Sequence, residues 1–512
     1  MATSLGCTTE LCAGHSLTAG TRAHGRLLPA ALIAGGVAIV WLVSADVVLA
    51  SCGYIASKAQ SGWATTVGYA AGHALGAFAI IAVACSPRLR QWAGARLDRL
   101  ARTLEQPGGL LLLLGLLTVV RVAWILLVPT QPTSDNAAYH GLATRLVETG
   151  MYDTAKHRAY WPPGYPVFLT GLYAVFGPSL LVAKLGNVVL AAGVDLLTWH
   201  AVRRHVSAPA AGAALLLTAL WPGRNLHVDV LSYDELVMAL LLLSLVLLPR
   251  VDRVDARHAW LWMAGGLVLG LACLVRPTLG LVPAAIGGWL LVRGCSLWRA
   301  VVLTGVYGLA MLAAITPWTI RNYVVLGRFV PLTTNAGGNF YNSWAPGGTG
   351  CFHKPAWEHL WAVTGGDELQ MSPTGFALGM AAIRTDLPAA IWRVAQKQVH
   401  YVGSDNWLLP VESYTAALGG NATAGDALKL GVHTLSNAWY VVLMLLPISA
   451  VRRMTRLIAA QPLAWLCIAV FATGLITHTV FEAQARYHLV YLPCWSILAA
   501  CLWAGRAPVR QP

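Results

Sequence analysis

Charged residues are scarce in this sequence, and their scarcity decides its broad class. Asp, Glu, Lys and Arg make up only 11% of the 512 residues, while hydrophobic residues make up 57%. An ordinary soluble domain carries about a quarter charged residues. Apolar runs of roughly twenty residues, long enough to cross the hydrocarbon core of a bilayer, recur along the chain. The composition therefore excludes an ordinary soluble protein and predicts an all-α polytopic membrane protein.

Paired cysteines and a cleavable signal peptide are also lacking. The ten cysteines are scattered and form no CxxC pair, which argues against a disulfide scaffold or a structural zinc site. The first apolar run, near 27–50, is longer than the hydrophobic part of a signal peptide, and a second run follows it. We therefore interpret the first run as a retained membrane span.

Acidic residues are too few to balance the basic ones. The sequence has 21 Asp and Glu against 35 Lys and Arg, which gives a formal net charge of +14. No basic face is combined with stacking aromatic residues, so nucleic-acid binding is not expected. The arginines instead cluster in short loops, as the positive-inside rule describes for the cytoplasmic side of a membrane. The clustered residues are Arg88, Arg90, Arg96, Arg99, Arg102, Arg203, Arg204, Arg250, Arg253, Arg257, Arg293, Arg299, Arg452, Arg453 and Arg456.

The apolar runs predict about twelve transmembrane spans with both termini in the cytoplasm. The expected spans lie near 27–50, 63–86, 108–129, 179–200, 208–222, 232–249, 258–275, 278–293, 300–317, 433–450, 461–480 and 487–504. The run 166–176 is too short to span and predicts an interfacial helix. The expected units are a tail with two extra spans (1–107), a catalytic membrane module with an outer loop at 130–178 (108–320), a small extracytoplasmic domain (321–432) and the C-terminal spans (433–512).

The outer loop opens with the stretch SDNAAYHGLATRL, residues 134–146, which has helical periodicity. Ser134 is the expected N-cap, and Asp135 lies in the first turn, where the helix dipole favours an ionised carboxylate. An apolar face of Ala138, Leu142 and Leu146 is expected to hold this helix in the membrane interface. A role for Asp135 as nothing more than a helix cap is the alternative.

Other ionisable residues lie at the predicted outer ends of spans. A single such residue usually anchors a helix at the interface. Carboxylates and arginines gathered on one face of a bundle instead indicate an acid/base group next to an anion-binding group. The residues in question are Asp229, Asp234, Glu235, Arg276, Arg321, Glu482, Arg486 and His488.

Several motifs, taken in order, resemble the GT-C superfamily of membrane glycosyltransferases that use polyprenyl-phosphate sugars. The bacterial relatives of protein O-mannosyltransferases and of the lipid A aminoarabinose transferase are the most similar. The matching pieces are SDNAAYHGLA, WPPGYPVFLTGLYAVFG, SYDELVMALLLL, LACLVRPT, TPWTIRNYVVLGRFVPLTTNAGGNFY and ARYHLVYLP. They cover roughly 108–345 and 461–504, whereas 1–107 and most of 346–432 have no counterpart in the resemblance.

The resemblance implies roles for individual residues. Asp135 matches the catalytic carboxylate of the first outer loop, Glu235 with Asp234 matches the acidic start of a later span, and Arg276 matches the basic residue that holds the lipid phosphate. Tyr160 and Trp161 replace an acidic-basic pair found before the proline in some relatives, so the source of a second cation stays open. The remaining candidates are Arg321, Lys156, His157 and Arg158 for the donor phosphate, and Tyr139, His140, Arg486 and His488 for substrate binding.

The expected function is an inverting glycosyltransferase at the outer face of the cytoplasmic membrane. One carboxylate takes the proton of the acceptor hydroxyl, and arginines stabilise the leaving phosphate, so no covalent enzyme intermediate is needed. No cofactor is expected. Asp135, Asp229 and Glu235 can supply oxygen ligands to a divalent ion. Similar families work without such an ion, so no metal is predicted. A polytopic secondary transporter is the alternative, since Arg121 and Lys184 lie inside spans, and a membrane scaffold is the third reading.

The substrates stay open at this stage. The resemblance leaves mannose, arabinose-type and other hexose donors open, so a hexosyl or pentosyl transferase is expected. The acceptor is a glycan, lipid, protein or small molecule. Four tryptophans in the extracytoplasmic segment either stack on acceptor sugars or pack the core of that segment; they are Trp344, Trp357, Trp361 and Trp407.

Overall fold

A computed structural model describes residues 63–128, 130–154, 156–248, 258–403, 405, 411–449 and 462–504. Within these residues the chain is helical and contains no strand, so the predicted all-α class is confirmed. The expected span at 27–50 lies outside the described residues. The membrane part comprises α2 (Trp63–Cys85), α3 (Pro87–Glu105), α4 (Pro107–Leu127), α7 (Leu180–His205), α8 (Ala208–Ala219), α9 (Pro222–His227), α10 (Asp234–Leu247), α11 (Ala259–Val275), η3 (Pro277–Leu281), α12 (Val282–Val292), α13 (Leu297–Leu326), α19 (Ala422–Ser449), α21 (Pro462–Val480), η4 (Ala485–Tyr491) and α22 (Leu492–Ala504).

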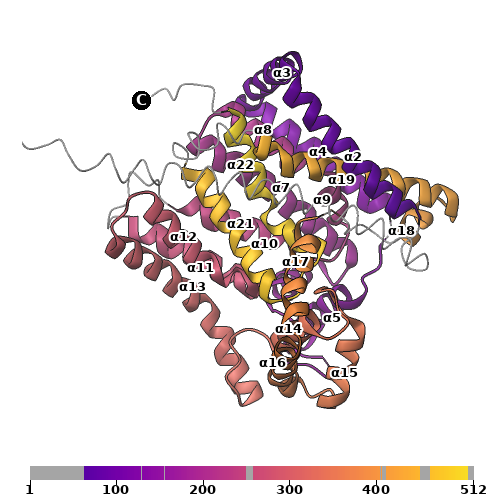
Figure 1. Cartoon of the computed structure of the whole chain (residues 1–512), viewed down its shortest axis with the longest axis vertical. Coiled ribbons are helices and arrows are strands. Elements are labelled where there is room, and N and C mark those ends of the chain that lie inside the picture. The colour runs from indigo at the N-terminus through magenta and orange to yellow at the C-terminus, as the bar shows by residue number, and fades with distance from the viewer. Residues whose placement is uncertain are drawn as a thin grey trace, which may run out of the picture.

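Seven further helices complete the described part of the chain. They are α5 (Ser134–Thr149), α6 (Gly164–Phe176), α14 (Ala336–Trp344), α15 (Lys354–Thr364), α16 (Glu368–Thr385), α17 (Leu387–Val402) and α18 (Val411–Ala417). Figure 1 shows α14, α15 and α16 at the lower end and the arginine-bearing α3 at the upper end. Helices α14, α15 and α16 therefore lie at the end of the helical bundle opposite to α3, as the predicted topology requires.

Five described helices are long and apolar enough to cross a membrane: Gly108–Leu127, Leu180–His205, Leu297–Leu326, Ala422–Pro447 and Pro462–Val480. Other apolar helices, such as Ala208–Ala219 and Ala259–Val275, are shorter. The predicted number of about twelve spans is therefore not established by the described residues. Two predicted domain limits fall inside helices, because α13 continues to Leu326 with Pro317 in its interior and α19 already begins at Ala422.

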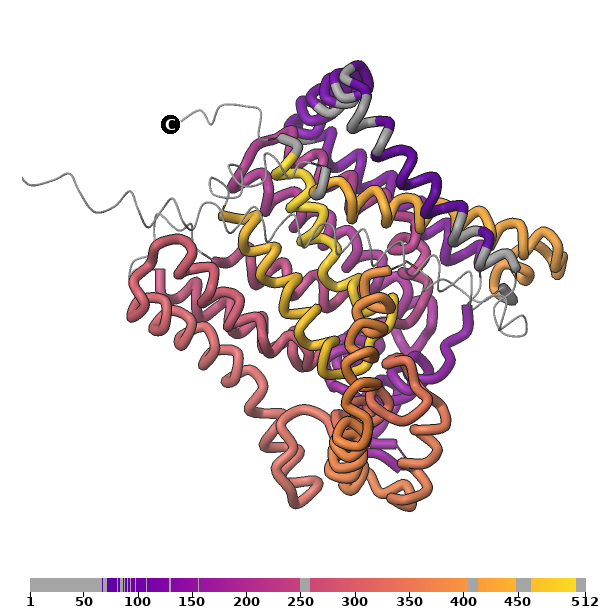
Figure 2. Tube along the Cα trace, viewed as in Figure 1, coloured from indigo at the N-terminus to yellow at the C-terminus, as the bar shows by residue number. Residues whose placement is uncertain are grey.

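Small residues bring α11 and α13 into close contact on one side of the bundle, where Figure 2 shows α11, α12 and α13 side by side. A Cβ atom added at Gly266 would lie 2.2 Å from the carbonyl oxygen of Tyr307, and one at Gly270 would lie 2.4 Å from that of Met311. Glycine is therefore required at both positions, as in other helix pairs that pack tightly within membranes.

The outer helices form a small unit that is fastened to the first outer loop. Tyr341, Leu360 and Met371 are core residues of this unit. Glu368, at the start of α16, is buried and accepts hydrogen bonds of 2.7 Å from the backbone N–H groups of both Arg158 and Ala159. A buried carboxylate paired in this way fixes the loop against the outer helices.

We predict that α3 faces the cytoplasm and that α15 faces outward, because the arginines of α3 follow the positive-inside rule. Arg96 is exposed on α3, and the Glu358 side chain is 63% exposed on α15. In a cysteine-free background, an impermeant maleimide should label Glu358→Cys on intact cells and Arg96→Cys only after permeabilisation. The reverse labelling pattern would overturn the topology.

Candidate active site

Asp135 lies in the first turn of α5, as predicted, but the start of this helix differs from the prediction. Ser134 is the first helical residue and has a φ of 51°, while Thr133 occupies the N-cap position without a side-chain hydrogen bond. Ser134 is therefore not the N-cap. A left-handed φ at a non-glycine residue costs about 1 kcal/mol, so the backbone is strained immediately before the candidate catalytic carboxylate.

Trp161 fixes the Asp135 side chain and was not singled out as a functional residue by the sequence. Its indole Nε1 donates a 2.9 Å hydrogen bond to Asp135 Oδ1. Leu142, two helical turns after Asp135 and on the same side of α5, is buried, and α5 packs against α6. Protein rather than lipid therefore covers Leu142 of the predicted interfacial face, whereas Ala138 and Leu146 are half-buried. This packing holds the half-buried Asp135 at the outer end of the bundle.

Asp234 and Glu235 begin α10 side by side, but they point to different places. Asp234 Oδ2 accepts a 3.0 Å hydrogen bond from His227 Nε2 and a second one from the Ser232 hydroxyl. Asp234 Oδ1 lies 3.9 Å from Nη1 of Arg276. Asp234 therefore belongs to the group of residues around Arg276.

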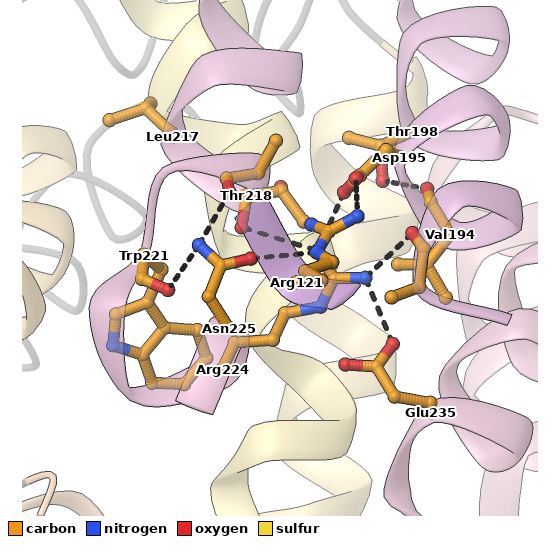
Figure 3. Close-up of polar contacts among 12 residues, drawn as sticks. Arg121, Val194, Asp195, Thr198, Leu217, Thr218, Trp221, Arg224, Asn225 and Glu235 are labelled. Carbon is orange, nitrogen blue, oxygen red and sulfur yellow. Dashed lines mark hydrogen bonds and ion pairs between the residues drawn. The ribbon is translucent and has the colours of Figure 1, made fainter. Parts of the chain in front are cut away.

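Glu235 instead belongs to a buried charge cluster shown in Figure 3. Arg224 of α9 contacts Glu235 Oε2 at 2.9 Å and Asp195 Oδ1 at 2.6 Å, and Arg121 of α4 contacts Asp195 Oδ2 at 2.8 Å. All four side chains are at most 2% exposed. Two arginines balance two carboxylates, so the cluster is neutral and joins α4, α7, α9 and α10. The structure thus places Glu235 in this cluster and not beside Asp135.

Arg276 lies at the C-terminal end of α11 and is the most suitable phosphate ligand among the predicted arginines. It is 4% exposed, and its Nε donates a 3.0 Å hydrogen bond to Thr278. The guanidinium lies 4.8 Å from the ring centre of Tyr487 and 5.9 Å from that of Tyr233. Its buried Nη1 has no hydrogen-bond partner among the described residues. A ligand oxygen would satisfy this donor.

The other predicted phosphate ligands lie in the outer loop region, where His157 packs against the rings of Tyr160 and Trp161. Arg321 donates 2.6 Å hydrogen bonds to the carbonyl oxygens of Arg158 and Tyr152, so both of its terminal nitrogens are occupied. Arg158 is exposed and donates a 3.3 Å hydrogen bond to the Val325 carbonyl. Lys156 is exposed and lies 5.4 Å from the ring centre of Trp361. The structure does not bring these residues to Arg276.

The predicted substrate-binding residues separate into two pairs. Tyr139 packs edge-on against Tyr233 at 5.9 Å between ring centres, and Arg486 lies 5.6 Å from the ring centre of Tyr487. His140 instead makes a 2.8 Å hydrogen bond with the Tyr173 hydroxyl, and the fully buried His488 makes a 2.6 Å one with the Tyr401 carbonyl. Tyr139 and Arg486 therefore join the group around Arg276, whereas His140 and His488 make structural contacts.

Contacts between aromatic rings connect Asp135 to Arg276. Tyr139 follows Asp135 by one helical turn and touches Tyr233, and the Tyr233 ring lies next to the Arg276 guanidinium. These contacts link a half-buried carboxylate on α5 to a buried guanidinium at the end of α11. A carboxylate can take a proton from a hydroxyl group, and a guanidinium can bind an anion.

Across the described ranges, no three His, Cys, Asp or Glu side chains lie close enough together to hold a metal ion. Asp229, one of the possible oxygen ligands, forms a 2.7 Å ion pair with Lys184. The metal-free reaction stays a prediction.

Residues 161–320 match the family model of the dolichyl-phosphate-mannose-protein mannosyltransferases. This match covers less than a third of the chain and supports a resemblance to the GT-C superfamily of glycosyltransferases. The expected resemblance is confirmed, and the matched residues include Asp234, Glu235 and Arg276, while Asp135 precedes them. No curated protein matches the chain in sequence.

Solved structures of membrane glycosyltransferases are similar to the chain. ArnT from Cupriavidus metallidurans, in a crystal structure with undecaprenyl phosphate, is 17% identical over 78% of each chain, with a TM-score of 0.38. The apo state of the same protein gives a TM-score of 0.35. The archaeal oligosaccharyltransferase AglB from Archaeoglobus fulgidus, in complex with an inhibitory peptide and a dolichol-phosphate, is 13% identical over 77% of this chain and 50% of its own, with a TM-score of 0.43.

Removal of Arg224 should destabilise the bundle strongly. Arg224→Ala leaves the carboxylates of Asp195 and Glu235 without their shared partner, and an uncompensated buried charge costs about 3–5 kcal/mol. Arg203→Ala is the matched control, because the Arg203–Glu105 ion pair is 46% and 41% exposed and such a pair contributes about 0–1 kcal/mol. Thermal unfolding of the purified variants measures the difference, and equal melting temperatures would contradict it.

Proposed function

We propose that this protein transfers a sugar from a polyprenyl-phosphate-linked donor to an acceptor hydroxyl, with inversion, on the outer side of the cell membrane. The family match supports glycosyl transfer and a lipid-phosphate donor. The observation that carries the proposal is the Arg276 guanidinium, which is buried at the outer end of the bundle with a terminal nitrogen that donates no hydrogen bond to any described residue. That nitrogen suits an anionic ligand.

The reaction is a single displacement. The acceptor oxygen attacks the anomeric carbon of the donor sugar while the bond from that carbon to the phosphate oxygen breaks. The bonding electron pair stays on the phosphate, where Arg276 stabilises the developing charge. Asp135 takes the proton of the acceptor hydroxyl, and its hydrogen bond with Trp161 orients the carboxylate for this step. The products are the glycosylated acceptor and a polyprenyl phosphate.

The two buried carboxylates of α10 have separate roles in this proposal. Asp234 faces Arg276 and keeps the guanidinium oriented toward the phosphate, while Glu235 anchors α10 through Arg224. Arg321 anchors the outer loop through the carbonyl oxygens of Tyr152 and Arg158. The catalytic role predicted for Glu235 and the phosphate-binding role predicted for Arg321 are therefore replaced by positioning roles.

Replacing Asp135 with asparagine should abolish most of the transfer. The substitution keeps the shape of the side chain and removes the base, so turnover should fall by about a hundredfold or more, while lipid binding and thermal stability stay close to those of the unmodified protein. Transfer of a labelled sugar from undecaprenyl-phosphate donors in proteoliposomes measures this. Full activity of Asp135→Asn would show that Asp135 only supports the helix, and movement of the intact lipid-linked sugar without transfer would favour a transporter.

Replacing Arg276 with alanine should weaken stabilisation of the leaving phosphate. Loss of one preorganised donor in other enzymes costs about 3 kcal/mol, or about a hundredfold in rate. Arg276→Lys should restore part of the activity, because it keeps the charge but loses the planar arrangement of donors. Arg321→Lys is the comparison variant, and donor kinetics decide the assignment. If Arg276→Ala retains normal donor kinetics, the phosphate site is elsewhere.

A further inference from the structure

Glu482 lies in the short segment between α21 and η4, and no step of the proposed reaction uses it. Glu482 is 6% exposed. The backbone is held on both sides: the Glu482 carbonyl makes a 2.6 Å hydrogen bond with His478 Nδ1, and the N–H of Ala483 donates a 3.0 Å hydrogen bond to the Gly350 carbonyl. The segment therefore presents the Glu482 carboxylate in a fixed position.

Among the described residues, the hydrogen bonds to this carboxylate reach one of its two oxygens. Oε1 accepts a hydrogen bond of 3.2 Å from the Tyr487 hydroxyl and a second one from the Gln484 side chain. Oε2 accepts no hydrogen bond from the residues that the structure describes. Because a carboxylate has several acceptor positions, the free oxygen can accept hydrogen bonds from a ligand.

The position of Glu482 relates it to both halves of the candidate active site. Tyr487, which donates to Glu482, has its ring 4.8 Å from the Arg276 guanidinium. Burial is the main cause that raises the pKa of Glu482, and the Asp135 carboxylate adds to this effect. Through the Tyr487 ring, Glu482 is therefore held next to the proposed phosphate ligand, the region that the sugar of a lipid-phosphate donor enters.

We infer that Glu482 binds the donor sugar by accepting hydrogen bonds from its ring hydroxyl groups through Oε2. This inference rests on the proposed function and deepens it by assigning sugar recognition to a residue distinct from the base and from the phosphate ligand. Hydrogen bonds from hydroxyl groups to an ionised carboxylate are charge-assisted and stronger than neutral ones. Sugar binding thus adds to the affinity that the lipid phosphate provides.

Charged groups from several elements face Glu482 and set its protonation. Burial is the main cause that raises the pKa of this carboxyl group to about 7, and Asp135 adds to the effect while Arg486 opposes it. Burial and Arg393 lower the pKa of the Lys397 ammonium group of α17 to about 7, and Glu482 opposes this shift. Tyr160 faces the same space and carries no charge, since burial and the carboxylates of Asp135 and Glu482 raise its pKa. The ionised fraction of Glu482 therefore increases as the pH rises through about 7.

The test compares the dissociation constants of two kinds of lipid for the full-length protein in nanodiscs. One is undecaprenyl phosphate, and the other is undecaprenyl phosphate carrying mannose, glucose or 4-amino-4-deoxyarabinose. Glu482→Gln should reduce the extra affinity given by the preferred sugar by about threefold to tenfold and Glu482→Ala by about tenfold or more, with undecaprenyl phosphate binding unchanged. Arg276→Ala should weaken the binding of both kinds of lipid. Glu358→Gln, on the exposed outer surface, is the matched control.

The pH dependence gives a second readout that a purely structural role would not change. The extra affinity given by the sugar should rise between about pH 6 and about pH 8 in the unmodified protein and stay flat in Glu482→Gln. Unchanged sugar affinity in both Glu482 variants would overturn this inference, as would equal binding of undecaprenyl phosphate and all three sugar-linked lipids by the unmodified protein. Failure to bind either kind of lipid would also reject the proposed function.

Discussion

The buried ion pairs of Arg224 with Glu235 and Asp195 constrain much of this structure. A charge within a membrane bundle is tolerated only when it is paired, and here one arginine on the six-residue helix α9 contacts carboxylates on α7 and α10. Arg121 of α4 completes the neutral set by pairing with Asp195. The start of α10 is therefore fixed in position and rotation. A ligand site that includes the first turn of α10 is therefore held in place by the same ion pairs.

The divergence of Asp234 and Glu235 follows from that constraint. Adjacent residues of a helix point about 100° apart, so an anchored Glu235 directs its neighbour to another surface. Asp234 then faces His227 and Arg276 at the outer end of the bundle. On the opposite side, Trp161 holds Asp135, and Glu368 holds the backbone next to Trp161. The ion pairs of Arg121, Arg224, Asp195 and Glu235 lie within the bundle and hold helices together. Asp135 and Arg276 instead have atoms that can bind a substrate.

The sequence predicted the helical class and the place of Asp135 in the first turn of a helix, because composition and helical periodicity report these features directly. It could not distinguish among the arginines. Arg276 and Arg321 both follow apolar helices, yet Arg321 is occupied by two backbone carbonyls whose positions depend on the folded outer loop. Arg224 was missed because it lies in a short, unremarkable loop sequence. Its partners, Asp195 and Glu235, are distant from one another along the chain, so only the folded bundle shows that they meet.

We propose that Arg276, and not Arg321 or Arg158, binds the phosphate of a polyprenyl lipid. Cryo-electron microscopy of the protein in nanodiscs with undecaprenyl phosphate can show this contact. We expect phosphate density within a hydrogen bond, about 2.7–2.9 Å, of the terminal nitrogens of Arg276, with Arg224 still between Asp195 and Glu235. Phosphate density at Arg321 or Arg158, with Arg276 making no contact to the lipid, would exclude Arg276 as the phosphate ligand.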